Sequence, residues 1–157
     1  MRKFLILILT VLTLAVSCET EFGSTVIAQE AMIEKFINDS LSHCEIVHNS
    51  GVNRAILTPG AGAAVEEGDE VAFDYIGYVL DEGHLYSFTQ GSISEPVGSG
   101  ELLKGLDLGL VGAKRNEDCL VIFTAEYGYG KGALNVVPEA SALAFGVHIV
   151  SISKSGD

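Results

Sequence analysis

The sequence is poor in several residue types, and each shortage excludes a class of protein. It has no Trp, three Pro and three Cys among 157 residues, and nine Lys and Arg stand against 21 Asp and Glu. So few Cys argue against a small disulfide-stapled scaffold. The acidic balance argues against nucleic acid as a partner, because phosphates would repel the chain. The 18 Gly and the 48% of hydrophobic residues are instead typical of a β-rich globular domain with many tight turns.

Long apolar runs are also scarce, and the exception lies at the N-terminus. Arg2 and Lys3 precede an apolar run over residues 4–16, which ends at Ser17 and Cys18. A basic start, an apolar stretch of about a dozen residues and a small-residue end predict a signal peptide over residues 1–17. The run is shorter than the roughly 20 residues that span a membrane.

The end of this leader resembles the bacterial lipobox, which implies that Cys18 is lipidated and anchors the mature chain to a membrane. Ala15 stands where that motif usually has Leu, so ordinary signal-peptide cleavage remains the alternative. Residues 18–25 would then form a short polar tether.

Residues 26–44 predict an amphipathic helix and its connector. The apolar residues that recur at helical spacing are Ile27, Ala31, Met32, Ile33, Phe36 and Ile37. The polar face is not basic, which argues against a membrane-surface helix. We expect the apolar stripe to pack against the following domain or against a second copy of the chain.

The remainder, residues 45–157, predicts one β-rich domain. Turn signals at residues 49–51, 59–62, 66–69 and 81–83 separate short strand patterns, among them the alternating residues 71–78. We expect a loop over residues 88–96, a short helix over 101–110, a strand over 119–124, a Gly-rich loop over 128–135 and a last strand over 142–152. The fold class is α+β, with an antiparallel sheet wrapped around one short helix and an extra N-terminal helix.

Two Cys, Cys44 and Cys119, follow the predicted tether. Cys119 shares a strand face with Val121 and Phe123, which favours a buried thiol, although a Cys44–Cys119 disulfide remains open in an oxidising compartment. The four His are scattered, and neither they nor the Cys have the spacing of a metal site. We expect no cofactor.

Four short motifs follow one another in the C-terminal half. They are Leu102-Leu103-Lys104-Gly105-Leu106, Tyr127-Gly128-Tyr129-Gly130, Val136-Val137-Pro138 and Ala142-Leu143-Ala144-Phe145. This order and spacing resembles the FKBP-type peptidyl-prolyl cis–trans isomerases, over about two thirds of the chain. The leader adds a resemblance to the members that are bacterial envelope lipoproteins.

The resemblance implies a set of pocket residues. Those implied to be catalytic are Tyr75, Tyr86, Leu103, Tyr129 and Phe145, and those implied to bind substrate are Leu102, Leu106, Val137, Ser87 and Glu101. Leu103 would give a backbone N–H, Tyr129 a hydroxyl and Phe145 an aromatic wall. Two positions depart from the family, because Leu106 replaces its frequent Trp and Tyr86-Ser87 stand where it usually has Phe-Asp.

The implied activity needs no nucleophile, acid–base pair or metal. Rotation about an X–Pro bond crosses a barrier of roughly 20 kcal/mol, and a dry apolar pocket favours the twisted amide over the more polar planar one. The resemblance implies proline-containing exported polypeptides as substrates and macrolides as possible inhibitors. The expected protein is a monomer, lipid-anchored in the cell envelope and facing the periplasm or the cell surface. The alternative is a catalytically weak peptide-binding or chaperone module with the same fold.

Overall fold

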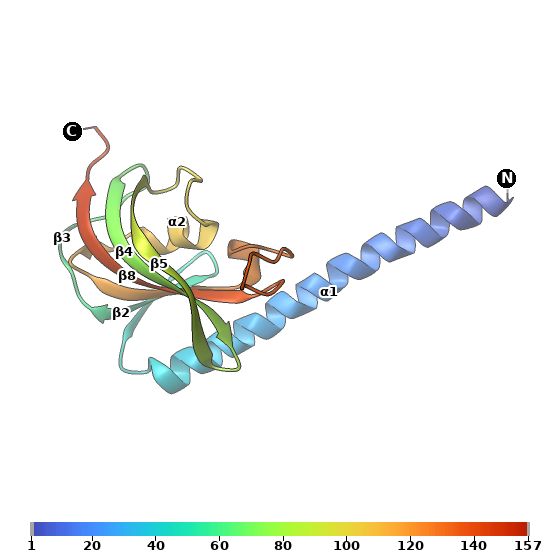
Figure 1. Cartoon of the computed structure of the whole chain (residues 1–157), viewed down its shortest axis with the longest axis horizontal. Helices are drawn as coiled ribbons and strands as arrows, with labels where there is room; N and C mark the ends of the chain where they lie inside the picture. Colours follow the sequence, from blue (N-terminus) through green and yellow to red (C-terminus); the bar gives the residue numbers. More distant parts are fainter. Residues whose placement is uncertain (1, 157) are drawn as a thin grey trace.

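The computed structural model describes the backbone of residues 2–156 and the side chains of residues 21–156. Two α-helices, a short 3-10 helix and eight strands follow one another (Figure 1). In chain order they are α1 (Arg2–Ser40), β1 (Glu45–Asn49), β2 (Val52–Thr58), β3 (Ala61–Ala64), β4 (Glu70–Asp81), β5 (His84–Pro96), α2 (Lys104–Leu110), β6 (Lys114–Arg115), β7 (Asp118–Phe123), η1 (Ala125–Tyr127) and β8 (Ala142–Ser153).

One antiparallel sheet forms the body of the domain. Its six strands lie in the order β1-β2-β7-β8-β4-β5, while β3 and β6 form a separate two-stranded sheet. The large sheet curves around α2, and α1 runs along the opposite side (Figure 1). This arrangement confirms the predicted α+β fold.

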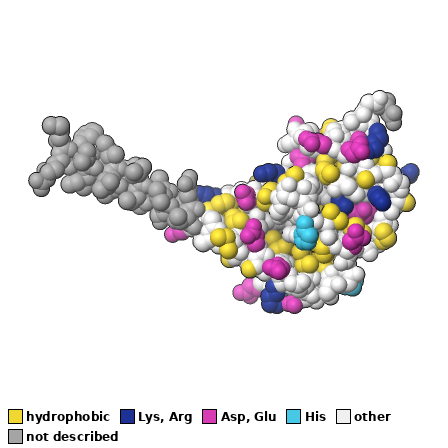
Figure 2. Space-filling model, turned by 180° about the vertical axis from the view of Figure 1, so that it is seen from behind, with side chains coloured by type: hydrophobic (Ala, Val, Ile, Leu, Met, Phe, Trp, Pro, Cys, Tyr) yellow, Lys and Arg dark blue, Asp and Glu magenta, His cyan; other side chains and the backbone are white. Residues whose placement is uncertain are grey.

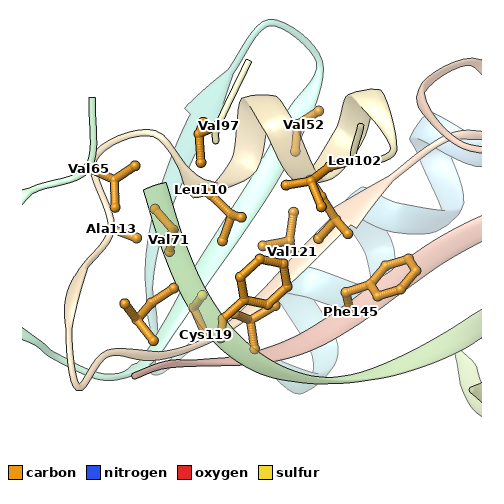
Figure 3. Close-up of a cluster of buried hydrophobic side chains, with 14 of the residues drawn as sticks. Val52, Val65, Val71, Val97, Leu102, Leu110, Ala113, Cys119, Val121 and Phe145 are labelled. Atoms are coloured by element: carbon orange, nitrogen blue, oxygen red, sulfur yellow. The ribbon is translucent and has the colours of Figure 1, made fainter. Parts of the chain in front are cut away.

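Both faces of the sheet are covered, as strand β7 shows. Cys119, Val121 and Phe123 are buried on the face that carries α2, whereas Leu120 and Ile122 belong to the cluster under α1. Successive side chains of a strand point to opposite faces, so one strand supplies two cores. Figure 3 shows the α2 side, where Cys119, Val121 and Phe145 lie in one cluster with Leu102 and Leu110.

The helix α1 is part of the folded domain. Ile33 and Phe36 are buried against a patch of the sheet that includes the small residues Ala55 and Ala144. The predicted packing on the domain is therefore confirmed for this part of the apolar stripe, whereas Ile27 and Ala31 are exposed. The helix also includes residues 18–25, where we expected a tether. The predicted signal peptide and the side chain of Cys18 lie outside the residues whose side chains are described. Within residues 21–156, no helix has the length and hydropathy of a membrane span.

Strand β5 differs most from expectation. Residues 88–96, expected to be a loop, continue this strand and pair with β4 as far as Glu70 opposite Pro96. They include Gly91, Glu95 and Pro96, residue types that are depleted in strands, so the sequence alone gives little sign of a strand here. The helix α2 is shorter than expected and begins at Lys104. Cys44 and Cys119 are both free thiols, Cys119 fully buried, so the disulfide alternative is not realised.

A buried arginine fixes the end of α2. The Arg54 guanidinium donates hydrogen bonds to the carbonyls of Gly109, at 2.9 Å, and Val111, at 2.7 Å. Its Nε lies 3.1 Å from a carboxylate oxygen of Glu117, and both side chains are less than 5% exposed. The last carbonyls of a helix have no partner within the helix, so Arg54 satisfies them and ties α2 to the sheet.

Candidate functional site: an aromatic cleft above the short helix

A cleft of about 300 Å³ opens on the α2 side of the sheet. It lies between the start of α2, strands β4, β5 and β8, and the loop that precedes β8. Its lining residues are Phe73, Tyr75, Phe88, Thr89, Ile93, Glu101, Leu102, Leu103, Leu106, Tyr129, Leu134, Asn135, Val136 and Phe145. Most of them are apolar or aromatic, as in small-molecule and peptide sites.

Phe145 is the centre of the cleft's aromatic wall. Its ring centroid lies 6.1 Å from that of Tyr75 and 6.0 Å from that of Phe88, the latter edge to face. These rings come close because β4 has a glycine opposite them. A Cβ on Gly77 would lie 2.9 Å from Phe145 and 2.7 Å from the Thr89 methyl, so any side chain there would displace the wall.

The floor of the cleft is the first turn of α2. Leu102 and Leu106 are buried there, and the helix lies directly on β7. A Cβ on Gly105 would come within 2.3 Å of the Phe123 ring, and one on Gly109 within 2.2 Å of Val121. The two glycines, unfavourable inside a helix by propensity, therefore allow the helix to sit low enough to leave a cleft above it.

The backbone before α2 places one polar group at the cleft. Leu103 is the N-cap residue, and its carbonyl accepts hydrogen bonds from the N–H groups of Leu106 and Asp107 at 2.8 and 3.0 Å. Among the described residues, no backbone hydrogen bond outside the helices and strands uses the Leu103 N–H as donor. The Asp107 carboxylate accepts from the Gly98 N–H at 2.8 Å, which holds the preceding loop against the helix.

Tyr129 places the second polar group at the cleft. Burial raises the pKa of its hydroxyl above the ordinary value, and the neighbouring Tyr75 raises it further. The hydroxyl therefore stays protonated and able to donate a hydrogen bond throughout the neutral range. Leu103 and Tyr129 both line the cleft, so the Leu103 N–H and the Tyr129 hydroxyl are its candidate hydrogen-bond donors.

The sequence of this region matches a known family. Residues 62–150, more than half of the chain, match the family described as FKBP-type peptidyl-prolyl cis-trans isomerase. The chain belongs to this family. The match supports peptidyl-prolyl isomerase function.

Individual relatives agree with the family match. FK506-binding protein 1 of Aspergillus oryzae is 30% identical over 115 residues, which cover 66% of this chain and 99% of that protein. FK506-binding protein 3 of Eremothecium gossypii is 35% identical over 97 residues, 59% of this chain, but these are only 22% of its own length.

Solved structures share the fold. A peptidyl-prolyl cis-trans isomerase from Pseudomonas syringae pv. tomato superposes with a TM-score of 0.69 at 17% identity, covering 84% of this chain and 96% of that one. The structure of the three FKBP domains of wheat FKBP73 superposes with a TM-score of 0.64 at 23% identity, over 71% of this chain and 50% of that one.

The FKBP-type cleft brings together seven of the ten residues predicted for it. They are Tyr75, Glu101, Leu102, Leu103, Leu106, Tyr129 and Phe145. Their roles in substrate binding and catalysis remain predictions. Within residues 21–156, no group of three His, Cys, Asp or Glu side chains is arranged to hold a metal ion.

Tyr86 and Ser87 do not line this cleft, which corrects our prediction for this side. Tyr86 is 58% exposed and lies near His84. In the pairing of β4 with β5, Thr89 is opposite Gly77 and Ser87 is opposite Tyr78, so Phe88 is an extra residue in a bulge. Phe88 and Thr89 consequently take the places predicted for Tyr86 and Ser87. Both pairs are an aromatic followed by a hydroxyl residue, so the sequence pattern alone did not separate them.

Val137 is also placed differently from the prediction. It is 1% exposed, whereas Val136 is 73% exposed and lines the cleft. A bridge between Leu134 and Val137, with N–H···O distances of 3.1 and 2.9 Å in the two directions, accompanies this inward placement of Val137. Val136 and Leu134 line the cleft with exposed side chains, whereas Val137, predicted to bind substrate, does not line it.

Proposed function

We propose that this protein catalyses the cis–trans isomerisation of X–Pro bonds in the cleft above α2. The observation that carries the proposal is that the aromatic rings packed around Phe145 and the residues Leu103 and Tyr129 line one cleft. The family match supports the same activity.

The proposed mechanism uses the cleft's residues for desolvation and positioning. The proline ring would lie against Phe145 and the α2 floor, where few water molecules fit. The planar X–Pro amide has a larger charge separation than the twisted one, so an apolar surrounding raises the energy of the planar form relative to the twisted form. The Leu103 N–H and the Tyr129 hydroxyl would hold the carbonyls on either side of the rotating bond.

A protease-coupled assay on a short proline peptide tests this function. We expect the wild-type chain to accelerate the slow phase of cleavage, and Phe145→Ala to abolish that acceleration. Thermal unfolding of the variant must be followed in parallel, since truncating a buried Phe costs about 3–5 kcal/mol. A folded wild-type protein without catalysis on any proline peptide would refute the proposal.

A catalytically weak peptide-binding or chaperone module is the second candidate. Its support is that Thr89, with a hydroxyl, occupies the place where the resemblance implies a carboxylate. Among the described residues that line this cleft, Glu101 is the one with a carboxylate. Thr89→Asp distinguishes the two functions. Faster isomerisation by this variant indicates a weakened enzyme, and unchanged slow turnover with tight peptide binding indicates the binding module.

We further propose that the chain is a monomeric lipoprotein of the cell envelope that acts on exported polypeptides and faces the periplasm or the cell surface. The support is the leader that ends at Cys18. Cys18→Ala is expected to release the protein from membranes or to leave it unprocessed. If labelled fatty acid enters the Cys18→Ala protein as it enters the wild type, the lipid anchor is not at this residue.

Light scattering on the purified protein measures its molar mass and so tests whether it is a monomer. Titration with a macrolide tests whether such compounds occupy the cleft.

A further inference from the structure

A second, larger hollow adjoins the cleft. Its volume is about 530 Å³, and it lies beside α1, between the β4–β5 hairpin and the loop that precedes β8, two segments that flank the helix in Figure 1. We call it the α1 groove. Phe88 and Val136 line both the α1 groove and the cleft, so the two hollows lie side by side with these side chains between them.

The α1 groove has a firmly held floor. Gln29 of α1 is 7% exposed, accepts a hydrogen bond from the Ala125 N–H at 2.9 Å and donates one to the carbonyl of Ala140. One side chain thus fixes the helix to both ends of the segment that carries Tyr129. On either side of Gln29 along the floor lie Ala28, exposed, and Met32, half-buried. The groove is therefore formed before any ligand binds.

The lining indicates the chemistry of the occupant. Apolar atoms come from Met32, Tyr86 and Pro138, and the charged side chains are those of Asp81 and Glu139. Lys and Arg are absent from the described residues that line it. Tyr86 and Val136 leave 58% and 73% of their surfaces exposed, apolar area that a bound chain would cover.

We propose that the α1 groove binds the segment of a client polypeptide next to the proline in the cleft, and that it prefers an extended segment with apolar and basic residues. The proposal rests on the proposed function. Because the α1 groove shares Phe88 and Val136 with the cleft, a polypeptide whose proline lies in the cleft has its neighbouring residues within reach of the groove. The proposal adds that α1 takes part in substrate selection, and that clients are recognised over several residues rather than by proline alone.

The test compares three proline peptides on the purified full chain. One has the proline with short flanks, and the other two extend it by four residues, Leu-Lys-Leu-Lys, before or after the proline. We expect one extended peptide to have a kcat/KM about tenfold above that of the short one, since burying one large apolar side chain is worth about that factor. If neither extension gains, the proposal is wrong.

Two groove variants and one control make the test specific. Ala28→Trp fills the floor at an exposed helix position, and Glu139→Lys reverses an exposed charge. Each should remove most of the gain for the extended peptide and leave the short peptide unchanged. Glu45→Lys makes the same charge change on β1, at the opposite edge of the sheet from β5, and should preserve the gain. If Glu45→Lys loses the same gain in kcat/KM, the basic peptide is attracted to the acidic protein as a whole, and the proposed binding to the α1 groove is refuted.

A binding measurement separates this proposal from the proposed activity. Fluorescence anisotropy with the better extended peptide, labelled at the end of its extension, measures binding to the protein whether or not the X–Pro bond isomerises. Tighter binding than that of the labelled short peptide, lost in Ala28→Trp, supports the groove even if isomerisation is absent. Catalysis of the short peptide without tighter binding of the extended one supports the activity and refutes the groove.

Discussion

The rings of Phe145 and Phe123 lie almost parallel, with centroids 5.9 Å apart and an angle of 11° between their planes. Phe145 lines the cleft and Phe123 lies under Gly105 of α2. The stacked pair therefore links the wall of the cleft to its floor, and displacement of either ring would be transmitted to the other.

Gly105→Ala tests this link. In an exposed helix the change would stabilise by up to about 1 kcal/mol through propensity, but here the new methyl would overlap the Phe123 ring. Overpacking of this kind costs about 1–3 kcal/mol or more, so we expect a net loss of stability by chemical denaturation. A Gly105→Ala protein more stable than wild type would show that α2 is free to shift away from β7.

Tyr129→Phe removes one hydroxyl and keeps the ring. If that hydroxyl donates to a substrate carbonyl, kcat/KM on a proline peptide should fall by a factor worth about 0.5–1.5 kcal/mol, while the melting temperature stays close to that of wild type. Tyr78→Phe is the matched control, because Tyr78 packs in the cluster under α1 on the other face of the sheet. Equal losses of activity in both variants would contradict the role assigned to Tyr129.

The helix α1 offers a comparison between a buried and an exposed position. Phe36 is 8% exposed, whereas Ile27 is 67% exposed. We expect Phe36→Ala to lower the free energy of unfolding by about 3–5 kcal/mol and Ile27→Ala to change it by less than about 0.5 kcal/mol. Urea unfolding of both variants checks this. Similar small effects would mean that α1 contributes little to the domain.

Asp69 gives the protein an acid-sensitive contact. Its carboxylate accepts hydrogen bonds from the Lys154 ammonium at 2.8 Å and from the N–H groups of Glu66, at 2.8 Å, and Ser155, at 3.0 Å. The hydrogen bond from Lys154 first, and then that from Glu66, lower the pKa of Asp69 from 3.8 to about 2. The contact thus ties the end of the chain to the turn before β4.

The sign of the pH dependence follows from the lowered pKa. The ionised form is favoured in the folded state, so its contribution to stability is complete above the unfolded pKa near 4 and is lost as the pH falls towards 2. Asp69→Asn should therefore be less stable than wild type at pH 6, and the difference in melting temperature should shrink between pH 4 and pH 2. A difference that is constant over this range would assign the effect to packing rather than to charge.

The sequence predicted the parts of the fold and the cleft that rest on local patterns. The helical spacing of Ile33 and Phe36 indicates the helix, and the unbroken apolar run over residues 119–123 is typical of a strand that is buried on both faces. Strand β5 carries no such signal, because its residues beyond Phe88 are polar, Gly or Pro except for Ile93 and are held by pairing with β4.

The bulge at Phe88 explains the misplaced residues of the cleft. A bulge adds one residue to one strand. It therefore changes which side chains of that strand point to the α2 face, and the amino-acid composition of the strand does not reveal this change. Tyr86 and Ser87 were assigned by resemblance, as the residues that stand where the family usually has Phe-Asp, and the bulge moves that place to Phe88 and Thr89. The exchange of Val137 for Val136 also depends on a local backbone feature. An isolated bridge between Leu134 and Val137 accompanies the inward placement of Val137, and two adjacent valines give no sign in the sequence of which one is buried.

The close contact between α2 and β7 limits how this scaffold can be redesigned. With no room for a methyl at Gly105 or Gly109, the distance between α2 and β7 is set by backbone contact and leaves no choice of side chain at these two positions. Leu134, Asn135 and Val136, by contrast, are exposed on a loop. A library that varies these three positions and leaves α2 unchanged is therefore the economical route to altered selectivity, because it reshapes the entrance while the folding unit beneath keeps its packing.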